Sequence, residues 1–548
     1  MLLGAQAPSK EEVLRAMRKA AEFYRYKVST EGGYHYYYTA DLSYGRSESA
    51  EGPTQVEVQR EATPIVAFAY LDAYEATGER VYLEFARAAA EALVRGQLCS
   101  GGWDYLIEFA PEKRQLYQYR ADNNCAEGAR GVTNLDDNVT QAAVRVLMRV
   151  DRALNFPDAR IHEAVLFALD RLIAAQYPIG AWPQRFRRPR DFSRYPVKRA
   201  SYPEAWSRKW PGPDYQGHYT FNDNTILDAI DALLEAARIY NDSRYRAAAE
   251  KGGQFILLAQ MPEPQPAWAQ QYDAEMHPAW ARVFEPPSVT GGESQGILRA
   301  LMALYRETGD RKYLEPIPRA LEYLKRSAVP RGDAEVFRRI PEGAVLARFY
   351  ELKTNRPLYI TKGSRLQAAG LGSRMVDGYE ISYTPESVIT HYGVLVSGRE
   401  LAAIEEDYRQ LAAADPKMVR RPGKLRGLSP WSERPRRQPE SASLAAEARR
   451  LIDSMDERGA WTRMGVIGKA DRLVFAYAAK DMVLRISRGS SDGSAGSARD
   501  SGAQTIPLKE NDTVEIFVSA QPPLEKIISS ADFARNLTRL GEYVAGLR

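Results

Sequence analysis

Two short stretches place carboxylates directly before a helical pattern, where they could do chemistry. They read Asp136-Asp137-Asn138 and Asn222-Asp223-Asn224, and Gly291-Gly292-Glu293-Ser294 follows at the corresponding place later in the chain. Because the stretches recur at equivalent positions, we expect their carboxylates to converge on one mouth of the fold. Asp and Asn also cap helix N-termini well, so a purely structural role stays open beside a ligand-binding one.

Convergent carboxylates with neighbouring Asn carbonyl groups are ligands that a hard cation such as Ca²⁺ prefers. The sequence has no EF-hand loop and no HExxH or CxxC motif, which argues against zinc. Two carboxylates are also what retaining or inverting sugar hydrolysis needs. Asp137 and Asp223 are therefore candidates for a Ca²⁺ site, and a hydrolase site is the alternative.

Aromatic and basic side chains stand in the loops that precede later helices. Pro278-Ala279-Trp280-Ala281-Arg282 follows the strand-like stretch PAWAQQY, and Gly180-Ala181-Trp182 follows an earlier helix. Trp side chains on the floor of a cleft are natural platforms for sugar rings, although a single aromatic residue is more often part of a core. Arg suits planar carboxylate partners better than Lys does, so Arg282 is a candidate for an acidic ligand, with a plain surface position as the alternative.

A repeated helical hairpin must position these residues. Each unit has two stretches with apolar residues at i, i+3, i+4 and i+7, and the units cover residues 64–97, 138–176, 224–260 and 293–328. Because a hairpin cannot bury its apolar stripe alone, we predict that successive hairpins close into an α/α toroid, an all-α dominated fold with short β-strands. An open solenoid is the alternative. The long loops at 98–137 and 185–222 argue against it, since long loops in a compact domain are usually functional.

The units also share their connections. Three of them have similar connectors between the two helices, namely Thr77-Gly78-Glu79-Arg80, Asn241-Asp242-Ser243-Arg244 and Thr308-Gly309-Asp310-Arg311. The second helix tends to lead into a Gly- or Ala-aromatic step such as Gly101-Gly102-Trp103. Several steps continue with short alternation that is typical of a strand.

The bulk properties exclude several classes of protein. The 548 residues carry a formal net charge of +4, which is small for this length and does not indicate a nucleic-acid binder. No run of about 18 apolar residues exists, so no membrane span is predicted. The two cysteines, Cys99 and Cys125, predict neither a disulfide framework nor a metal cluster. No oligomer signature is visible, and we expect a monomer.

The N-terminus lacks the charged and fully apolar regions of a signal peptide. Ala5-Gln6-Ala7 nevertheless looks like the small-residue end of one. We therefore expect a secreted or periplasmic protein whose signal peptide is trimmed or incomplete.

The C-terminal part departs from the repeat. Residues 413–445 are rich in Pro, Arg and Ser and are expected to form an extended surface segment, and a helix is predicted from about Leu444 to Met455. Residues 468–522 combine strand-like stretches with a Gly/Ser-rich loop and predict a small β-rich insertion. The predicted domains are a toroid over 8–467, this insertion, and a C-terminal helix in 523–548 that packs back on the toroid.

Several motifs occur in an order that is specific. They are Thr133–Asn138, Gly180-Ala181-Trp182-Pro183-Gln184, Thr220-Phe221-Asn222-Asp223-Asn224, Pro278–Arg282 with Glu293-Ser294, Ala347-Arg348-Phe349-Tyr350-Glu351 with Thr354-Asn355-Arg356-Pro357, Asp456-Glu457-Arg458-Gly459-Ala460-Trp461, and Phe533-Ala534-Arg535-Asn536-Leu537. Together they resemble the pectate lyases of polysaccharide lyase family 10. The resemblance covers most of residues 10–467 and the segment from about Ile528.

The resemblance implies an (α/α)₃-type toroid that cleaves polygalacturonate by anti β-elimination. It implies that Asp223 helps to hold Ca²⁺ on the substrate carboxylate and that Asp137 lies at the same metal and substrate site. Arg282 corresponds to the catalytic Arg of the family. The remaining positions expected to bind the substrate are Arg348, Arg356, Trp182 and Trp280.

Two features depart from the family pattern, and one assigned role is chemically difficult. Asp136 directly precedes Asp137, so the register of that site is open by one residue. A guanidinium is essentially always protonated, so Arg282 needs neighbouring positive charge and dehydration to act as a base. The segment 468–522 is an insertion whose role the sequence does not give.

Two other functions stay open at this point. An α/α-toroid glycoside hydrolase would give saturated products without needing calcium. A non-catalytic pectin-binding protein would bind oligogalacturonates without cleaving them. We expect the lyase, which forms unsaturated oligogalacturonates from pectate with the assistance of Ca²⁺.

Overall fold

The structure is a computed structural model of the chain. It describes residues 7–156, 158–188, 191–363, 366–367, 375–376, 378–389, 392–419, 441–467, 483–486, 504–507 and 524–547. Every structural statement below refers to these residues.

The predicted helical hairpins are all present. Their paired helices are α2 (Thr63–Thr77) with α3 (Arg80–Arg95), α5 (Val139–Ala153) with α6 (Ala159–Ala174), α7 (Thr225–Tyr240) with α8 (Ser243–Ala259), and α9 (Glu293–Thr308) with α10 (Ile317–Arg326). The three connectors that look alike in sequence each contain a residue in the left-handed region, because Gly78, Asn241 and Gly309 have φ of 78°, 51° and 74°. Gly and Asn adopt this conformation at low cost and end helices with it.

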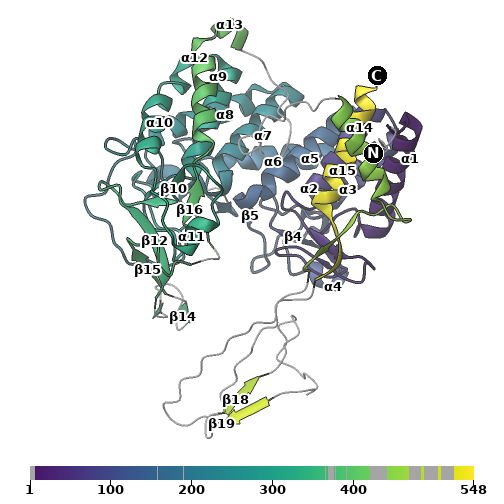
Figure 1. The fold of residues 1–548 in the computed structure, drawn as a ribbon, viewed down its shortest axis with the longest axis horizontal. Helices are drawn as coiled ribbons and strands as arrows, with labels where there is room; N and C mark the ends of the chain where they lie inside the picture. Colours follow the sequence, from purple (N-terminus) through teal and green to yellow (C-terminus); the bar gives the residue numbers. More distant parts are fainter. Residues whose placement is uncertain are drawn as a thin grey trace, which may run out of the picture.

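The helices form an inner and an outer layer. Inner helix α7 is buried on nearly all sides, from Thr225 to Ala236, whereas α6 buries only a stripe at helical spacing. Inner helices of neighbouring units pack against one another, α2 on α5 and α5 on α7. In Figure 1 the units follow one another from α2 and α3 to α9 and α10. This two-layer arrangement confirms the predicted α/α toroid.

Buried ion pairs also link two inner helices. Arg145 on α5 pairs with Asp231 on α7, and both side chains are fully buried. One turn further on each helix, Arg149 binds Glu235 at 2.5 Å. Unpaired charges in this position would be costly, so the pairs favour a single register of α5 against α7. These two helices begin directly after the acidic stretches that the sequence singled out.

The Gly- and Ala-aromatic steps are structural. In each step the indole Nε1 of a Trp donates to a carbonyl of the preceding helix: Trp103 to Leu93, Trp182 to Leu172, Trp268 to Ile256 and Trp461 to Leu451, at 2.7–2.9 Å. At the bend before Trp182 only Gly fits, because a Cβ on Gly180 (φ 102°) would lie 2.1 Å from the Lys251 carbonyl oxygen. The steps therefore seal the C-terminal ends of the outer helices.

Short antiparallel strands lie in the connecting loops. One sheet has the order β17 (Thr462–Gly465), β20 (Glu525–Ser529), β1 (Tyr37–Thr39) and β2 (Gly45–Arg46), and a second has β15 (Tyr379–Ser382), β12 (Pro357–Lys362), β11 (Phe349–Tyr350) and β9 (Val289–Thr290). In the first, Tyr38 is opposite Ile528, so the two ends of the chain are joined. The remaining pairs are β3 (Gln55–Glu57) with β4 (Leu106–Glu108), β5 (Thr133–Asn134) with β6 (Arg185–Phe186), β7 (Tyr219–Thr220) with β8 (Gln271–Tyr272), β10 (Val345–Ala347) with β16 (Leu395–Ser397), and β13 (Leu366–Gln367) with β14 (Met375–Val376).

Further helices pack against the first and the last of the hairpins. At one side of Figure 1, α1 (Lys10–Phe23) lies with α14 (Ser441–Asp453) and α15 (Ser530–Gly546), and α15 packs on α2. At the opposite side, α12 (Leu401–Ala413) packs on α9 and α10. The short helices α4 (Pro111–Arg114), α11 (Glu335–Arg338) and α13 (Pro416–Val419) lie in loops. The predicted helices near residues 444–455 and from Ser530 are confirmed.

The other C-terminal predictions fall mainly outside the described residues. Most of the segment 413–445 and of the insertion 468–522 belongs there. Within the insertion, β18 (Val483–Ile486) and β19 (Gln504–Pro507) pair antiparallel. The predicted domain boundaries stay a prediction.

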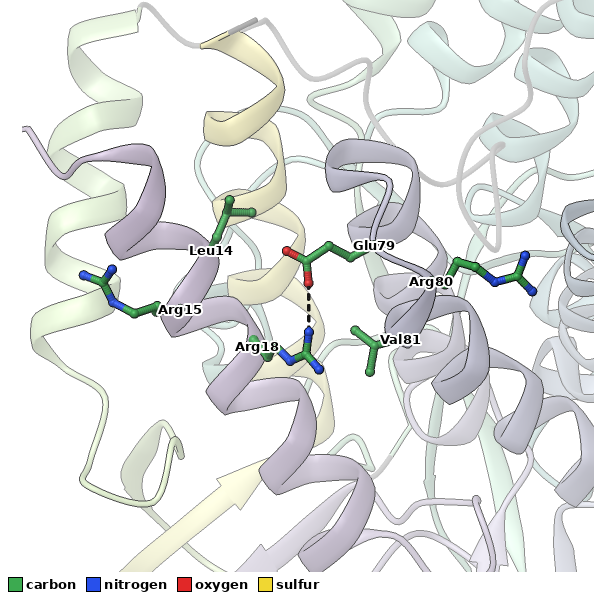
Figure 2. A pocket seen from close by; sticks show the side chains of 6 residues that line it. All are labelled: Leu14, Arg15, Arg18, Glu79, Arg80 and Val81. Atoms are coloured by element: carbon green, nitrogen blue, oxygen red, sulfur yellow. Dashed lines mark hydrogen bonds and ion pairs between the residues drawn. The ribbon is translucent and has the colours of Figure 1, made fainter.

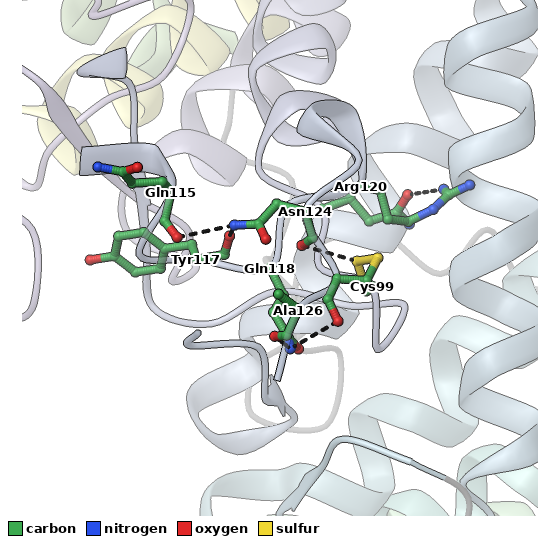
Figure 3. Close-up of a disulfide and its surroundings, with 9 residues drawn as sticks. Cys99, Gln115, Tyr117, Gln118, Arg120, Asn124 and Ala126 are labelled. Atoms are coloured by element: carbon green, nitrogen blue, oxygen red, sulfur yellow. Dashed lines mark hydrogen bonds between the residues drawn. A yellow bond between two sulfur atoms is a disulfide. The ribbon is translucent and has the colours of Figure 1, made fainter. Parts of the chain in front are cut away.

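The prediction for the two cysteines was wrong. Cys99 and Cys125 form a disulfide with a Cα–Cα distance of 5.8 Å (Figure 3). The sequence does not predict a single disulfide in a long chain, because the distance between the two cysteines depends on how the loop folds. Here Asn124 donates from its side chain to the carbonyl of Tyr117 at 2.8 Å, which brings the loop back toward Cys99. No helix in the described part of the chain is long and apolar enough to cross a membrane.

Candidate active site

The two acidic stretches adopt the same backbone conformation. Each is a short 3₁₀ turn between a strand and an inner helix, η3 (Asp136–Asn138) before α5 and η5 (Asn222–Asn224) before α7. Asp137 and Asp223 have φ of 48° and 47°. By backbone conformation, Asp137 corresponds to Asp223, and Asp136 corresponds to Asn222.

This conformation decides against simple capping. Asn138 and Asn224 also have positive φ, and neither makes a side-chain cap hydrogen bond to its helix. Positive φ is uncommon outside Gly, and residues held in such conformations cluster at functional sites. Two consecutive residues in each turn therefore adopt an unusual backbone conformation without capping the helix through a side chain.

The turns bring three carboxylates together. One oxygen each of Asp136, Asp137 and Asp223 lies within 4.8 Å of the others, with Asp136 buried, Asp137 half-buried and Asp223 exposed. Two side chains from the loops that flank the first hairpin hold Asp137, since Tyr105 Oη and Gln59 Nε2 donate to its Oδ2 at 2.9 and 3.1 Å. The sequence prediction that Asp137 and Asp223 converge is correct, and Asp136 joins them.

The cluster is electrostatically strained. Burial and the negative charge of Asp137 raise the pKa of Asp136 to about 6, although Gln184, Arg282 and Arg185 act in the opposite direction. Asp223 reaches solvent, yet the protein crowded around its carboxyl and the charges of Asp136 and Asp137 raise its pKa to about 7. A cation between these groups would favour their ionised forms. Three oxygen donors of this kind suit a hard divalent ion.

Arg348 extends the site toward the fourth unit. Its Nη2 donates to Glu293 Oε1 at 2.8 Å and to Asn222 Oδ1 at 3.4 Å. Its guanidinium also lies 4.3 Å from the centre of the Tyr392 ring. Arg348 therefore connects Glu293, which the sequence placed at the corresponding position of the fourth unit, with the turn that carries Asp223.

Arg282 is held by a neighbouring carboxylate. Its Nε and Nη2 donate to the two oxygens of Glu285 at 2.8 and 2.7 Å. Tyr392 and Gln270 donate to Glu285 as well, at 2.5 and 2.8 Å. Burial by itself lowers the pKa of Arg282, but the hydrogen bonds and charge of Glu285 outweigh it and raise the pKa. Arg282 is thus a firmly protonated guanidinium, and its charge acts on Asp136.

The other predicted substrate residues differ in their surroundings. Arg356 is exposed and stacks on Tyr383, with its guanidinium 3.5 Å from the ring centre. Trp280 is 8% exposed and donates from its indole to the Ser207 carbonyl, so only its edge reaches solvent. Trp182 is completely buried. The expectation that Trp182 offers a platform to the substrate was wrong, because it seals a helix end as its counterparts do in other units.

Several site residues were missed from the sequence. Gln59 and Tyr105 lie in the loops that flank the first hairpin and carry no motif, so only the packing of that hairpin on the next reveals them. Tyr392 likewise lies more than a hundred residues beyond Glu285. Glu285 lies only three residues after Arg282, but the two stand in a loop, where spacing does not predict an ion pair.

Two hollows stand out among the described residues. One of about 390 Å³ borders the acidic cluster and has Asp137 and Asp223 in its wall. The other, of about 360 Å³, lies between α1 and α3 and is lined by Arg15, Arg18, Arg80 and Glu79 (Figure 2). Its charged groups partly neutralise one another, since Arg18 binds Glu79 at 3.4 Å. Of these two hollows, the first is therefore the one that borders the acidic cluster.

One family model matches part of the chain. Residues 108–369, just under half of the chain, match the family model described as pectic acid lyase. No curated protein sequence matches the chain. The matched segment includes the acidic cluster together with Arg282, Arg348 and Arg356.

Solved structures with similar shapes exist at low identity. A mutant of a family 10 polysaccharide lyase from Cellvibrio cellulosa, in complex with trigalacturonic acid, is 19% identical, with a TM-score of 0.41 over 64% of this chain and 98% of that one. A cellobiose 2-epimerase from Spirochaeta thermophila is 15% identical, with a TM-score of 0.36 over 58% of this chain and 69% of that one. A D-mannose isomerase is also 15% identical, with a TM-score of 0.37 over 59% and 71%. At these scores the likenesses carry no argument about function.

The family match and the site agree. The matched segment supplies both the acidic turns and the arginines that act on them. Residues 108–369 thus match the pectic acid lyase family, and this match together with the site supports an enzyme of the pectate lyase class.

Proposed function

We propose that this pectate lyase cleaves polygalacturonate by calcium-assisted anti β-elimination and releases unsaturated oligogalacturonates. One observation carries the proposal: three carboxylates meet within 4.8 Å, and the charges of Arg282 and Arg348 act on them. Elimination from a uronate requires positive charge at the sugar carboxylate, because the neighbouring proton is otherwise too weakly acidic to leave. Carboxylates for a cation and guanidinium groups for the sugar supply both parts of that requirement.

The residues of the cluster fit Ca²⁺. All three donors are carboxylate oxygens, which is the ligand type that this ion prefers. Burial and, after it, the mutual repulsion of the carboxylates raise the pKa values of Asp136 and Asp223, and a divalent cation would relieve that repulsion. Asp137 and Asp223 would hold the ion, with Asp136 as a further ligand. Bound Ca²⁺ would supply positive charge to the carboxylate of the sugar that loses its proton.

Arginine side chains are proposed to bind the sugar carboxylates. Arg348 is already held in place by Glu293 and Tyr392, so little side-chain entropy is lost when it meets a substrate. Arg356 is exposed beside Tyr383 and can contact a carboxylate further along the chain. Planar guanidinium groups match carboxylates in a bidentate geometry.

Arg282 is proposed as the catalytic residue, and its ion pair with Glu285 limits how it can act. In the free enzyme Glu285 raises the pKa of Arg282, so the guanidinium cannot accept a proton there. A base role requires that substrate binding separates Arg282 from Glu285 and places positive charge nearby. A role as a clamp for developing negative charge requires no such change.

Export from the cytoplasm is part of the proposal. Disulfides persist in oxidising compartments and are rare in the cytosol, and the Cys99–Cys125 bond fits that environment. A polymeric plant-wall substrate would also have to be met outside the cell. We therefore propose that the enzyme is secreted or periplasmic, and that it acts as a monomer.

The proposal is tested with polygalacturonate and calcium. Elimination creates a conjugated double bond, so ultraviolet absorbance should rise with time, and excess chelator should stop the rise reversibly. New reducing ends without any rise in absorbance would show hydrolysis instead. Binding without new ends would identify a non-catalytic pectin-binding protein.

A further inference from the structure

The loop between β6 and β7 is fastened to the segment that carries the proposed catalytic arginine. Trp210 in this loop donates from its indole to the carbonyl of Ala281 at 2.8 Å. In return, Trp280 donates from its indole to the carbonyl of Ser207 at 2.8 Å. Ala281 directly precedes the catalytic arginine, and Ser207 directly precedes Arg208. The two bonds therefore hold Arg208 close to the catalytic segment.

Arg356 and Tyr383 meet at one end of two paired strands. Arg356 directly precedes β12 and Tyr383 directly follows β15, and the strands pair antiparallel with Tyr359 opposite Ser382. This register puts the end of β15 beside the start of β12. The Arg356 guanidinium accordingly lies 3.5 Å from the centre of the Tyr383 ring. Tyr383 lies beyond the segment that matches the family model, so the family match does not account for this contact.

Arg208 reaches the same ring from the loop. Its guanidinium lies 5.4 Å from the centre of the Tyr383 ring, which is within the range of a cation–π contact. Arg208 also forms an ion pair with Glu351. Glu351 in turn accepts hydrogen bonds from the hydroxyl groups of Tyr383 and Thr354. Two guanidinium groups from elements far apart in the sequence therefore share one aromatic ring.

This pair of guanidinium groups is positively charged and open to solvent. Arg356 is exposed and the Arg208 side chain is 54% exposed, whereas that of Glu351 is only 6% exposed. Among the described residues, Glu351 is the one carboxylate that forms an ion pair with either arginine, so the three groups keep one net positive charge. A guanidinium has five N–H donors, and the Glu351 contact, made through Nη2 of Arg208, leaves others for a ligand. Such a site suits a planar anion that accepts hydrogen bonds, above all a carboxylate.

We propose that Arg208 and Arg356 together bind the carboxylate of a second galacturonate, one other than the sugar that loses its proton. This inference rests on the proposed function, because it takes the substrate to be a chain of uronates that is cleaved beside Arg282. Every sugar of such a chain carries a carboxylate, so a chain held at Arg282 presents further carboxylates to its surroundings. Arg208 is a substrate-binding residue in this scheme. The bond between Trp210 and Ala281 sets its position relative to Arg282.

A cycle that combines enzyme variants with a change in ligand charge tests the site. Calorimetry measures the binding of trigalacturonate and of its trimethyl ester in excess chelator, where no calcium contributes and no cleavage occurs. The variants are Arg208→Gln and Arg356→Gln, both at exposed positions, and urea unfolding checks that each is folded. Arg244→Gln is the matched control. Arg244 is 62% exposed and ion-paired as well, but it lies at the start of α8, whereas Asp223 precedes the opposite end of that hairpin.

Arg208→Gln and Arg356→Gln should each weaken the binding of trigalacturonate about tenfold, the usual size for a hydrogen bond to a charged group. Binding of the ester should stay within about twofold, because it has no charge for the arginines to meet. Arg244→Gln should change neither. The inference is overturned by unchanged binding of the acid in either arginine variant, by equal losses for acid and ester, or by a wild type that does not bind the acid.

Kinetics separate this inference from the proposed function. With polygalacturonate in saturating calcium, Arg208→Gln should raise KM and leave kcat largely unchanged, because its contact exists equally before and during the reaction. A fall in kcat at unchanged KM would place Arg208 at the reacting sugar and contradict the second site. If the wild type does not cleave the polymer, the proposed lyase reaction fails, and the binding measurements still decide whether the arginine pair holds a uronate.

Discussion

Replacing Asp136 by Asn should stabilise the calcium-free enzyme at alkaline pH. Asp136 is buried, and burial together with the charge of Asp137 raises its pKa to about 6 from the ordinary value of 3.8. The folded state therefore holds this proton more tightly than the unfolded state does. The contribution of Asp136 to stability is therefore greatest at low pH and is lost as the pH rises from about 4 through 6. Asn keeps the shape of the side chain and an oxygen that can accept from Asn222, but it carries no charge.

The magnitude follows from the shift in pKa. About two pKa units at about 1.4 kcal/mol each give roughly 3 kcal/mol as an upper bound. We expect Asp136→Asn to raise the free energy of unfolding by about 2–3 kcal/mol at pH 8 and by much less at pH 4. Calcium should remove most of the difference at pH 8, because it stabilises the ionised cluster of the wild type.

Urea unfolding in excess chelator at pH 4 and pH 8 measures the effect. Asp170→Asn serves as the control, since Asp170 is an exposed position on α6 that pairs with Arg244 at 3.2 Å. The reasoning fails if Asp136→Asn destabilises the protein equally at both pH values. It also fails if the control shows the same pH-dependent gain.

Three further predictions concern the metal, the catalytic Arg and the disulfide. Asp223→Ala should lower activity by at least about 10²-fold at any calcium concentration that saturates the wild type; unchanged activity in excess chelator would remove the metal from the mechanism. If Arg282 is the base, Arg282→Ala should lower kcat by about 10²–10⁴-fold with little effect on KM. Arg282→Lys should then keep some activity, with a lower pH optimum. If Arg282 is only a clamp, Arg282→Ala should raise KM first and lower kcat less. Replacing both Cys99 and Cys125 by Ser opens a loop with a sequence separation of 26. The free energy of unfolding, measured with heat or urea, should fall by about 3.5 kcal/mol on chain-entropy grounds. Equal stability of the two proteins would refute the structural role of the disulfide.

The local features of the chain could be predicted from the sequence because they depend on neighbouring residues. Apolar spacing along 64–97, 138–176, 224–260 and 293–328 indicates helical pairs, and the Gly or Asn in the connectors ends the first helix of a pair by adopting positive φ. The recurrence of Asp-Asn before an inner helix likewise points to convergence, since equivalent positions of a repeat face the same mouth. That reasoning located Asp137 and Asp223 correctly.

Contacts between units could not be predicted in this way. Tyr392 binds Glu285, Gln59 and Tyr105 hold Asp137, and Trp182 is sealed in the core. Each of these depends on how one hairpin stacks against the next, and a periodic pattern carries no record of that stacking. The sequence alone therefore determined the repeating helices and the acidic turns. Tertiary structure decided which charges meet, because the energy of a charge depends on partners and solvent that the chain brings together only when it folds.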